Sequence, residues 1–255
     1  MRRVKVSLIS YLNTSPFVYG LKHSEVSEHI DIRYDTPADC AARLLSKDAD
    51  LGIVPSAALT SLPDRKIISN YCIGADGAVR SVALYSNRPP AEIETLYLDF
   101  ESRTSVLLAR LLAEYHWKLT PDVRPLTSLD EIDPSRTDAA YVLIGDKTFE
   151  FDGRFACKTD LAKEWKEFTG EPFVFALWTA VTPLSPAFVS MFNEALAAGV
   201  RNIPAAIEEH RHVLNYADAI KYLTENIDYN FDFAKHKALM RFWNMVLKLK
   251  SKYRS

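Results

Sequence analysis

The sequence has few cysteines, no excess of charge of either sign and no long apolar run. Its three cysteines, Cys40, Cys72 and Cys157, are odd in number and far apart, which argues against a disulfide framework or a clustered zinc site and predicts free thiols in a reducing compartment. The 255 residues carry a formal net charge of −2, so the chain has no electrostatic footprint for nucleic acid. No window approaches the length and apolarity of a membrane span, and we expect no membrane partner.

The N-terminal residues carry two arginines but lack the apolar stretch of a secretion signal. The pattern passes instead into an alternating segment, residues 4–9, which is typical of a strand. Together with the free thiols, this pattern leads us to expect a cytoplasmic protein, for a chain that is complete as given.

The chain also lacks the common signatures of cofactor and metal chemistry. No phosphate-binding loop, dinucleotide fingerprint or zinc-ligand spacing occurs, and the six histidines are scattered outside every motif-like segment. Histidine is the commonest general base in enzymes. We therefore expect a site with no cofactor, no metal ion and no histidine base.

Strand and helix patterns alternate through the first 180 residues, which predicts an α/β fold with mostly parallel strands. The composition, 48% hydrophobic and 25% charged, is that of an ordinary globular protein. Helices are expected after the caps Ser15 and Thr36, from Pro55 and throughout the chain after Pro186. On the helix after Thr36, we expect one face to carry Ala38, Ala41, Leu44 and Leu45. Strands are expected at 4–9, 31–34, 50–54, 67–72, 79–85, 94–99, 138–144 and 172–178, and further helices at 103–117 and 159–168.

A proline-rich link, residues 86–90 (SNRPP), separates two α/β sets, and helical patterns return after the second set. This order predicts two lobes. The first lobe comprises residues 1–88 and 180–255, and the second is the inserted segment 89–179. Ligands of open α/β folds bind at the ends of the strands, so a ligand cleft between the lobes is expected.

Two hydroxyl-rich turns directly follow predicted strands, one in each half of the chain. Residues 10–16 (SYLNTSP) precede a helix that starts at Pro16, and residues 102–105 (SRTS) precede the helix at 103–117. A helix start offers free N–H groups and the positive end of the helix dipole, which suit a carboxylate or phosphate. Ser, Thr and Asn at such positions are usually only caps. Simple caps and a small ligand with two negative groups therefore both stay open.

Several short motifs occur in a specific order between residue 7 and about residue 178. They are 10–13 (SYLN) with Pro16, 19–21 (YGL), 76–77 (DG), 79–82 (VRSV), 98–99 (LD), 102–105 (SRTS), 144–146 (IGD), 164–165 (EW), 169–170 (TG) and 172–175 (PFVF). This ordered set resembles the chorismate dehydratases of the futalosine route to menaquinone. One departure is Ala78, where the family usually has proline.

The resemblance implies a two-lobed fold of the type 2 periplasmic-binding-protein class, used as an enzyme. A sister family in the same route carries a reactive histidine and a Gly- and Pro-rich segment in its second lobe. This chain has residues 172–178 (PFVFALW) there and no histidine. The dehydratase is therefore preferred to the sister activity. A non-catalytic solute-binding protein for a small aromatic or dicarboxylic acid is the competing class.

The implied activity is that of a hydro-lyase, which removes water from chorismate and leaves 3-enolpyruvyl-oxybenzoate. Asn13 is the expected catalytic residue, because its amide can donate and accept hydrogen bonds at once, and the substrate's own arm carboxylate is the expected base. Asp76, Asp99 and Asp146 are the alternative bases. The expected substrate-binding residues are Ser10, Tyr11, Arg80, Ser81, Ser102, Arg103, Thr104, Ser105, Gly145, Asp146 and Phe173.

Each of these residues also has a purely structural interpretation. Asn13 is of a type common in Asx turns, and Arg80 fits an exposed strand arginine or an ion pair across the cleft. Phe173 lines the cleft in the functional interpretation and belongs to the core in the structural one. For Trp178 the core is preferred.

Overall fold

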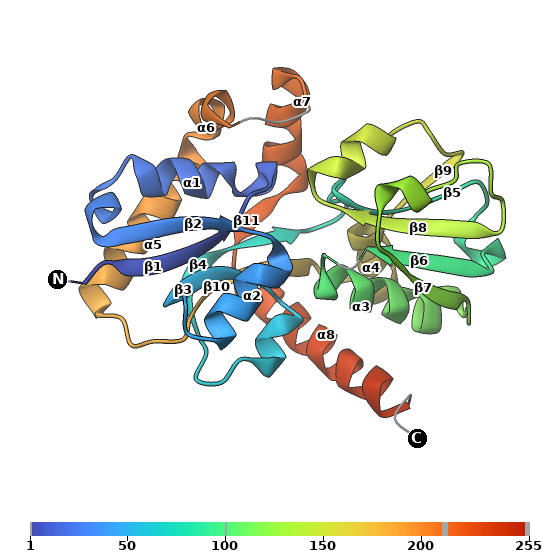
Figure 1. Cartoon of the computed structure of the whole chain (residues 1–255), viewed down its shortest axis with the longest axis horizontal. Helices are drawn as coiled ribbons and strands as arrows, with labels where there is room; N and C mark the ends of the chain where they lie inside the picture. The colour runs from blue at the N-terminus through green and yellow to red at the C-terminus, as the bar shows by residue number, and fades with distance from the viewer. Residues whose placement is uncertain (1, 100, 211–213, 253–255) are drawn as a thin grey trace. The chain divides into compact units, whose positions relative to one another are not determined.

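The computed structural model describes residues 2–99, 101–210 and 214–252 (Figure 1). Contacts within the chain divide it into two compact units. Unit 1 comprises Met1–Gly74 and Val174–Phe233, and unit 2 comprises Ala75–Phe173 and Ala234–Ser255. The sequence placed the C-terminal helix with residues 1–88, whereas its contacts group it with unit 2. The lobe boundaries drawn from the sequence stay a prediction.

Unit 1 is built on a six-stranded sheet with the order β11-β4-β10-β3-β1-β2. β1 pairs in parallel with β2 and β3, while β10 is antiparallel to β3 and β11 is antiparallel to β4. The sheet is therefore mixed, and its β3-β1-β2 part has the expected parallel order. The strands are β1 (Val4–Ile9), β2 (Ile30–Asp35), β3 (Leu51–Pro55), β4 (Lys66–Ala75), β10 (Phe173–Ala180) and β11 (Asp228–Asn230).

Two helices of unit 1, α1 (Ser15–Lys22) and α5 (Pro186–Arg201), pack with almost no space between their backbones. A Cβ atom added to Gly199 would lie 1.8 Å from the carbonyl oxygen of Pro16, and one added to Gly20 would lie 2.0 Å from that of Ala195. Only glycine permits this approach. The other helical segments of unit 1 are α2 (Pro37–Leu45), α6 (Ile203–Glu209), α7 (Tyr216–Lys221), the 3-10 turns η1 (Leu12–Thr14), η2 (Glu25–His29) and η3 (Ala58–Ser61), and the π-helix η8 (Tyr222–Asn226).

Four local predictions for unit 1 were wrong. Ser15 is the first residue of α1 instead of its cap, and the chain after Pro55 forms only the short turn η3. The region after Pro186 is not wholly helical, because β11 pairs with β4. The buried face of α2 is shifted by one residue from the expected face, since its buried residues are Pro37, Cys40 and Leu44.

Unit 2 is built on a five-stranded sheet with the order β7-β6-β8-β5-β9. β6 is parallel to β7 and β8, and β5 is antiparallel to β8 and β9. It follows that β6, β7, β8 and β9 all end at the edge of the sheet where β5 begins. The short strands β7 and β9 were not expected. The strands are β5 (Val82–Ser86), β6 (Thr95–Asp99), β7 (Asp122–Leu126), β8 (Ala139–Ile144) and β9 (Cys157–Asp160).

The expected helix at 103–117 consists of two parts, α3 (Arg103–Leu111) and the π-helix η5 (Leu112–Trp117). α4 (Leu161–Thr169) begins later than expected because residues 157–160 belong to β9, and it ends as expected at the left-handed Gly170. α3 and α4 pack against the sheet and contact each other (Figure 1). The remaining segments are η4 (Pro90–Glu92), η6 (Leu129–Glu131), η7 (Asp146–Phe151) and α8 (Phe233–Lys252).

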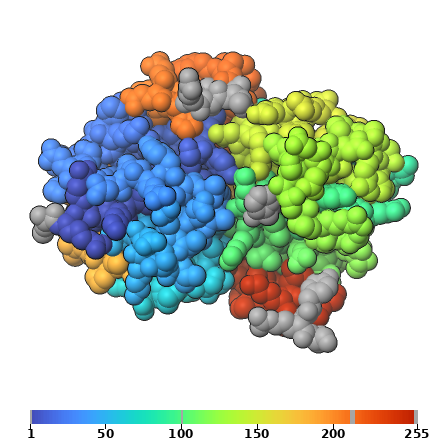
Figure 2. Space-filling model, in the orientation of Figure 1, coloured from blue at the N-terminus to red at the C-terminus, as the bar shows by residue number. Residues whose placement is uncertain are grey.

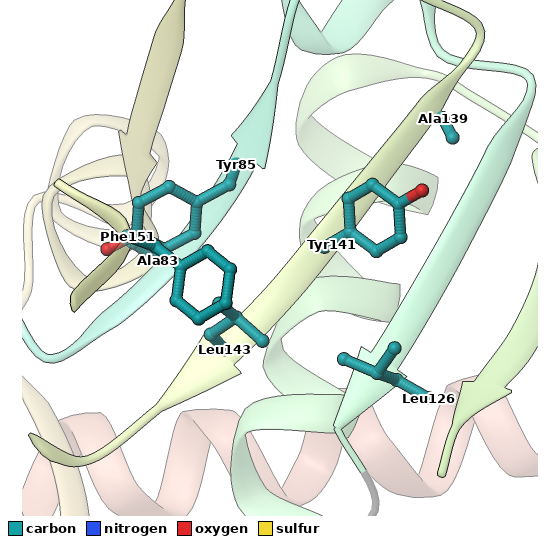
Figure 3. Close-up of a cluster of buried hydrophobic side chains, with 7 residues drawn as sticks. All are labelled: Ala83, Tyr85, Leu126, Ala139, Tyr141, Leu143 and Phe151. Carbon is teal, nitrogen blue, oxygen red and sulfur yellow. The ribbon is translucent and has the colours of Figure 1, made fainter. Parts of the chain in front are cut away.

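Two groups of aromatic side chains fill the core of unit 2. Alternate residues of β5 and β8 lie on one face, where Tyr85, Tyr141 and Phe151 pack with small and aliphatic neighbours (Figure 3). In the second group, the ring of Phe242 in α8 lies 6.1 Å from Trp165 and 5.0 Å from Phe173. This second group explains why α8 belongs to unit 2.

The outer face of α8 carries Met240 and Leu247, both more than half exposed, and the end of this helix lies on the surface in Figure 2. In the described part of the chain, no helix combines the length and the apolar character that a membrane span requires.

Candidate functional site

In unit 1, the turn after β1 holds the backbone of Asn13 firmly. The hydroxyl of Thr14 donates to the carbonyl oxygens of Ile9 at 2.6 Å and Tyr11 at 2.7 Å. The hydroxyl of Tyr229 donates to the carbonyl oxygen of Asn13 at 3.0 Å. Asn13 is therefore fixed from both sides, at the edge where the parallel strands β1, β2 and β3 end.

The side chain of Asn13, in contrast, is 9% exposed and makes no hydrogen bond to any residue that the structure describes. An Asx turn would need its amide oxygen to accept a backbone N–H, and no such bond forms among the described residues. The amide is therefore available to a ligand, which favours the functional interpretation of Asn13 over the structural one.

Ser15 is a residue of this turn that the sequence interpretation took only as a cap. Its hydroxyl is buried and has no hydrogen-bond partner within the described chain, while Thr14, at the cap position, makes no side-chain cap bond. Two unpaired polar side chains thus belong to one short turn. Of the other two predicted residues here, Tyr11 is half-buried and Ser10 is exposed.

In unit 2, the start of α3 combines buried hydroxyls with one exposed cation. Ser102 caps the helix, because its hydroxyl oxygen accepts the N–H of Ser105 at 3.2 Å, and the two hydroxyls lie 3.1 Å apart. Thr104 is also buried, whereas Arg103 is exposed. The cap prediction is confirmed for Ser102.

Asp160 joins the segment before β5 to the start of α4. Its carboxylate accepts the N–H groups of Val79 at 3.2 Å and Arg80 at 2.6 Å, and it also caps α4 through Ala162 and Lys163. Burial raises the pKa of Asp160, and these four backbone donors oppose that rise. Residues this far apart in sequence cannot be linked by local patterns, and the sequence analysis missed Asp160.

Arg80 has the left-handed backbone conformation, with φ at 64°. The expected strand over 79–85 was therefore wrong at its start, and β5 begins at Val82. The guanidinium of Arg80 lies 3.8 Å from the carboxylate of Asp152 and over the ring of Phe149. A strained backbone at a non-glycine residue is typical of functional positions. The contact with Asp152 is an ion pair within unit 2, so it does not test the expected ion pair across the cleft.

Gly145 directly follows β8 and has a backbone conformation, φ 68° and ψ −158°, that is nearly restricted to glycine. Its N–H donates to the carbonyl oxygen of Ser81 at 2.9 Å, and its own carbonyl accepts the hydroxyl of Thr148. These bonds join the end of β8 to the start of β5. Ser81, Gly145 and the half-buried Asp146 thus lie at the sheet edge that also carries the start of α3.

Lys147 is a cation of the same edge that the sequence analysis missed. Its ammonium lies 2.5 Å from Asp99 and 2.9 Å from Glu101. Asp99 is only 2% exposed, and burial raises the pKa of its carboxyl although Lys147 opposes the rise. The position of Lys147, directly after the 144–146 motif, was the one available signal.

We call this group of residues the unit 2 edge. The structure brings almost all predicted residues of unit 2 to it, since they lie where β6, β8 and β9 end and β5 begins. Phe173 is the exception, because it is 2% exposed and packs between Trp165 and Phe242. The unit 2 edge comprises Arg80, Ser81, Asp99, Ser102, Arg103, Thr104, Ser105, Gly145, Asp146, Lys147 and Asp160.

A sequence profile described as menaquinone biosynthesis matches residues 4–248. The chain belongs to this menaquinone biosynthesis family. The match spans both units and shows a role in menaquinone synthesis.

Solved structures similar to this member of the menaquinone biosynthesis family share its fold at low identity. Protein AF1704 from Archaeoglobus fulgidus has a TM-score of 0.74 at 15% identity, covering 97% of this chain and 98% of that one. An ABC transporter from Parabacteroides distasonis has a TM-score of 0.69 at 18% identity, covering 99% and 94%. The Candida albicans CA3427 gene product, described as having the generic periplasmic binding protein fold, has a TM-score of 0.65 at 11% identity, covering 98% and 90%. The expected α/β two-lobed, periplasmic-binding-protein-like fold is confirmed.

The chemistry that these two groups of residues can perform is binding and polarisation. Hydroxyls, backbone N–H groups at helix starts and the cations Arg80, Arg103 and Lys147 suit a carboxylate. The carboxylates of unit 2 are less suited to proton abstraction, because Asp99 is paired with Lys147 and Asp76 lies 2.5 Å from the ammonium of Lys166. The third alternative base, Asp146, is half-buried at the end of β8.

Proposed function

We propose that this member of the menaquinone biosynthesis family is a chorismate dehydratase, a hydro-lyase that forms 3-enolpyruvyl-oxybenzoate in the futalosine route. The observation that carries the proposal is Asn13, a largely buried residue whose backbone is fixed and whose side chain makes no hydrogen bond to the described residues. An elimination needs a group of this kind, which orients the enolpyruvyl arm and polarises the departing hydroxyl.

The reaction removes the hydroxyl from one ring carbon and a proton from the neighbouring carbon that bears the ether. That proton is allylic to the double bond conjugated with the ring carboxylate, so charge from its removal spreads into this carboxylate. Donors aimed at the carboxylate stabilise the transition state more than the ground state. The buried hydroxyls of Ser102 and Ser105 and the exposed guanidinium of Arg103 supply such donors in our proposal.

The base in our proposal is the substrate's own arm carboxylate. Three facts support this choice: no histidine belongs to either group of residues, and Asp99 and Asp76 are held by lysines. The protein then contributes placement and polarisation, and the turn at residues 10–16 holds the arm. A base that is already part of the bound substrate avoids the entropy cost of bringing a second reactant into position.

A second candidate is a non-catalytic binding protein for a small aromatic or dicarboxylic acid, because the solved structures of similar fold include the ABC transporter from Parabacteroides distasonis. Both candidates use the same donors. They differ in whether Asn13 takes part in the elimination of water from the bound molecule or only binds that molecule.

The deciding experiment incubates the purified full chain with chorismate and follows the product by absorbance and mass. The dehydratase predicts an aromatic product lighter than chorismate by one water, formed in proportion to the protein and not by heat-denatured protein. Chorismate that binds but is recovered unchanged would instead support the binding protein. Chorismate that neither binds nor reacts would exclude the dehydratase.

A further inference from the structure

We propose that His116, Glu164 and Glu167 in unit 2 form a site for a divalent transition-metal ion, with zinc as the best match. One ligand atom from each residue, an imidazole nitrogen and two carboxylate oxygens, lies within 4.8 Å of the other two. His116 comes from η5, and the two glutamates lie three residues apart on α4. The site is separate from the unit 2 edge and from the turn that carries Asn13.

The distances fit the coordination sphere of zinc. Two ligands held about 2.0 Å from a tetrahedral zinc ion lie about 3.3 Å apart. The Nε2 atom of His116 and the Oε2 atom of Glu164 lie 3.3 Å apart. Glu167, on the exposed side, completes the set by rotation of a flexible side chain. Three protein ligands leave a fourth position for water.

The local structure orients the two inner ligands. His116 lies in the last turn of a π-helix, a rare element that often marks functional positions, and its ring packs against Phe168 with 5.4 Å between centroids. The indole N–H of Trp117 donates to Oε2 of Glu164 at 2.7 Å. Outer hydrogen bonds of this kind hold the ligands of metal sites in place.

A simpler interpretation treats His116 and Glu164 as an ion pair. In that interpretation Glu167 has no function at the cluster and only pairs with Lys163, 3.6 Å away on the same helix. The metal site requires Glu167, and the ion pair does not. This difference makes Glu167→Gln the decisive variant, because it leaves the contact between His116 and Glu164 unchanged.

A metal ion here would join η5 to α4, two neighbouring segments of unit 2. Because Asp160 caps the start of α4 and η5 continues α3, the ion would fix both helices whose starts belong to the unit 2 edge. We therefore assign the ion a structural role. It binds the folded chain, so it raises the melting temperature of the protein.

The test titrates the full-length protein, first stripped with a chelator, with Zn²⁺ by calorimetry and with Co²⁺ by absorption spectroscopy. We expect one equivalent to bind, Co²⁺ bands typical of nitrogen and oxygen ligands, and a higher melting temperature. His116→Ala and Glu167→Gln should each lower the affinity by about tenfold or more. His29→Ala, an exposed histidine beside Glu28 in unit 1, is the matched control and should bind as the wild type does.

Several outcomes would overturn the proposal. They are no saturable Zn²⁺ binding, full binding by Glu167→Gln, or a thiolate charge-transfer band from Co²⁺ that disappears in Cys157→Ser. Chorismate turnover is not a readout of this test, so its outcome is independent of the proposed dehydratase.

Discussion

At the scale of single residues, Asn13 combines a fixed backbone with an unpaired side chain. We expect Asn13→Leu to lower the turnover of chorismate by roughly 10²–10³-fold, the usual effect of losing one well-placed donor. Binding should persist, because the carboxylate-binding groups remain. Asn13→Asp is the matched variant, since it keeps the shape and the acceptors but loses the donors, and we expect it to be equally slow. Steady-state kinetics and chorismate binding measure both effects.

A loss of binding with normal turnover at saturation would make Asn13 a positioning residue only. The search for a base would then return to the alternative carboxylates Asp76, Asp99 and Asp146.

Arg103 is exposed at the start of α3 and has no ion-pair partner among the described residues. We expect Arg103→Ala to weaken chorismate binding and leave the free energy of unfolding unchanged, because the side chain contributes charge and little packing. Arg110→Ala, an exposed arginine in the last turn of the same helix, is the control. Equal KM values for the two variants would show that the start of α3 is only a cap.

Asp99 makes stability depend on pH in a direction opposite to that of most carboxyls. Burial raises its pKa above the ordinary value of 3.8, so the folded chain binds this proton more tightly than the unfolded chain does. The resulting stabilisation is full below pH 3.8 and is lost as the pH rises through the raised pKa. We expect the wild type to lose stability relative to Asp99→Asn over this range in urea unfolding. A wild type that gains stability relative to Asp99→Asn as the pH rises would contradict the assignment.

At the scale of elements, the contact between α1 and α5 depends on two glycines. Gly199→Ala should stabilise α5 by about 1 kcal/mol on helix propensity alone. The added Cβ would lie 1.8 Å from the backbone of α1, so we expect the opposite sign, a destabilisation of about 1–3 kcal/mol. Because α1 follows the turn that carries Asn13, turnover should fall as well. Urea unfolding decides the sign, and a more stable variant would exclude the close packing.

Local patterns predicted the elements that are set by local chemistry. β1, β6 and β8 were expected close to their observed bounds, and so were the cap Ser102 and the stop at Gly170. The missed strands β7, β9 and β11 are short, and they exist because a neighbouring strand pairs with them. The buried face of α2 was missed for a related reason, since the sheet selects which side of a short helix is covered.

In the candidate site too, features set by local sequence were predicted and features set by contacts between distant residues were missed. The turns 10–16 and 102–105 were visible as polar residues after apolar strands. Asp160 and Lys147 were not, because their partners Arg80 and Asp99 are distant in sequence. Ser15 was assigned the wrong role, since only the folded turn shows that its hydroxyl lacks a partner.

At the scale of the whole molecule, catalysis and metal binding are expected to be independent. We expect chorismate turnover at 25 °C to survive exhaustive chelation, because no step of the proposed elimination uses a metal ion. The melting temperature should fall after chelation and recover with Zn²⁺. Turnover that requires added metal would refute the metal-free mechanism, whatever the melting temperature does.

The order in which the chain completes its two units also constrains its synthesis. Residues 174–233 complete unit 1, and only the residues that follow them provide α8 to unit 2. During synthesis, the apolar surfaces of Trp165 and Phe173 therefore stay exposed until α8 has left the ribosomal exit tunnel. Only then can Phe242 pack against them. Exposed apolar surface of this kind promotes aggregation during folding. A nascent chain that stalls before α8 would thus be a natural client for chaperones, even though most of the protein has already been made.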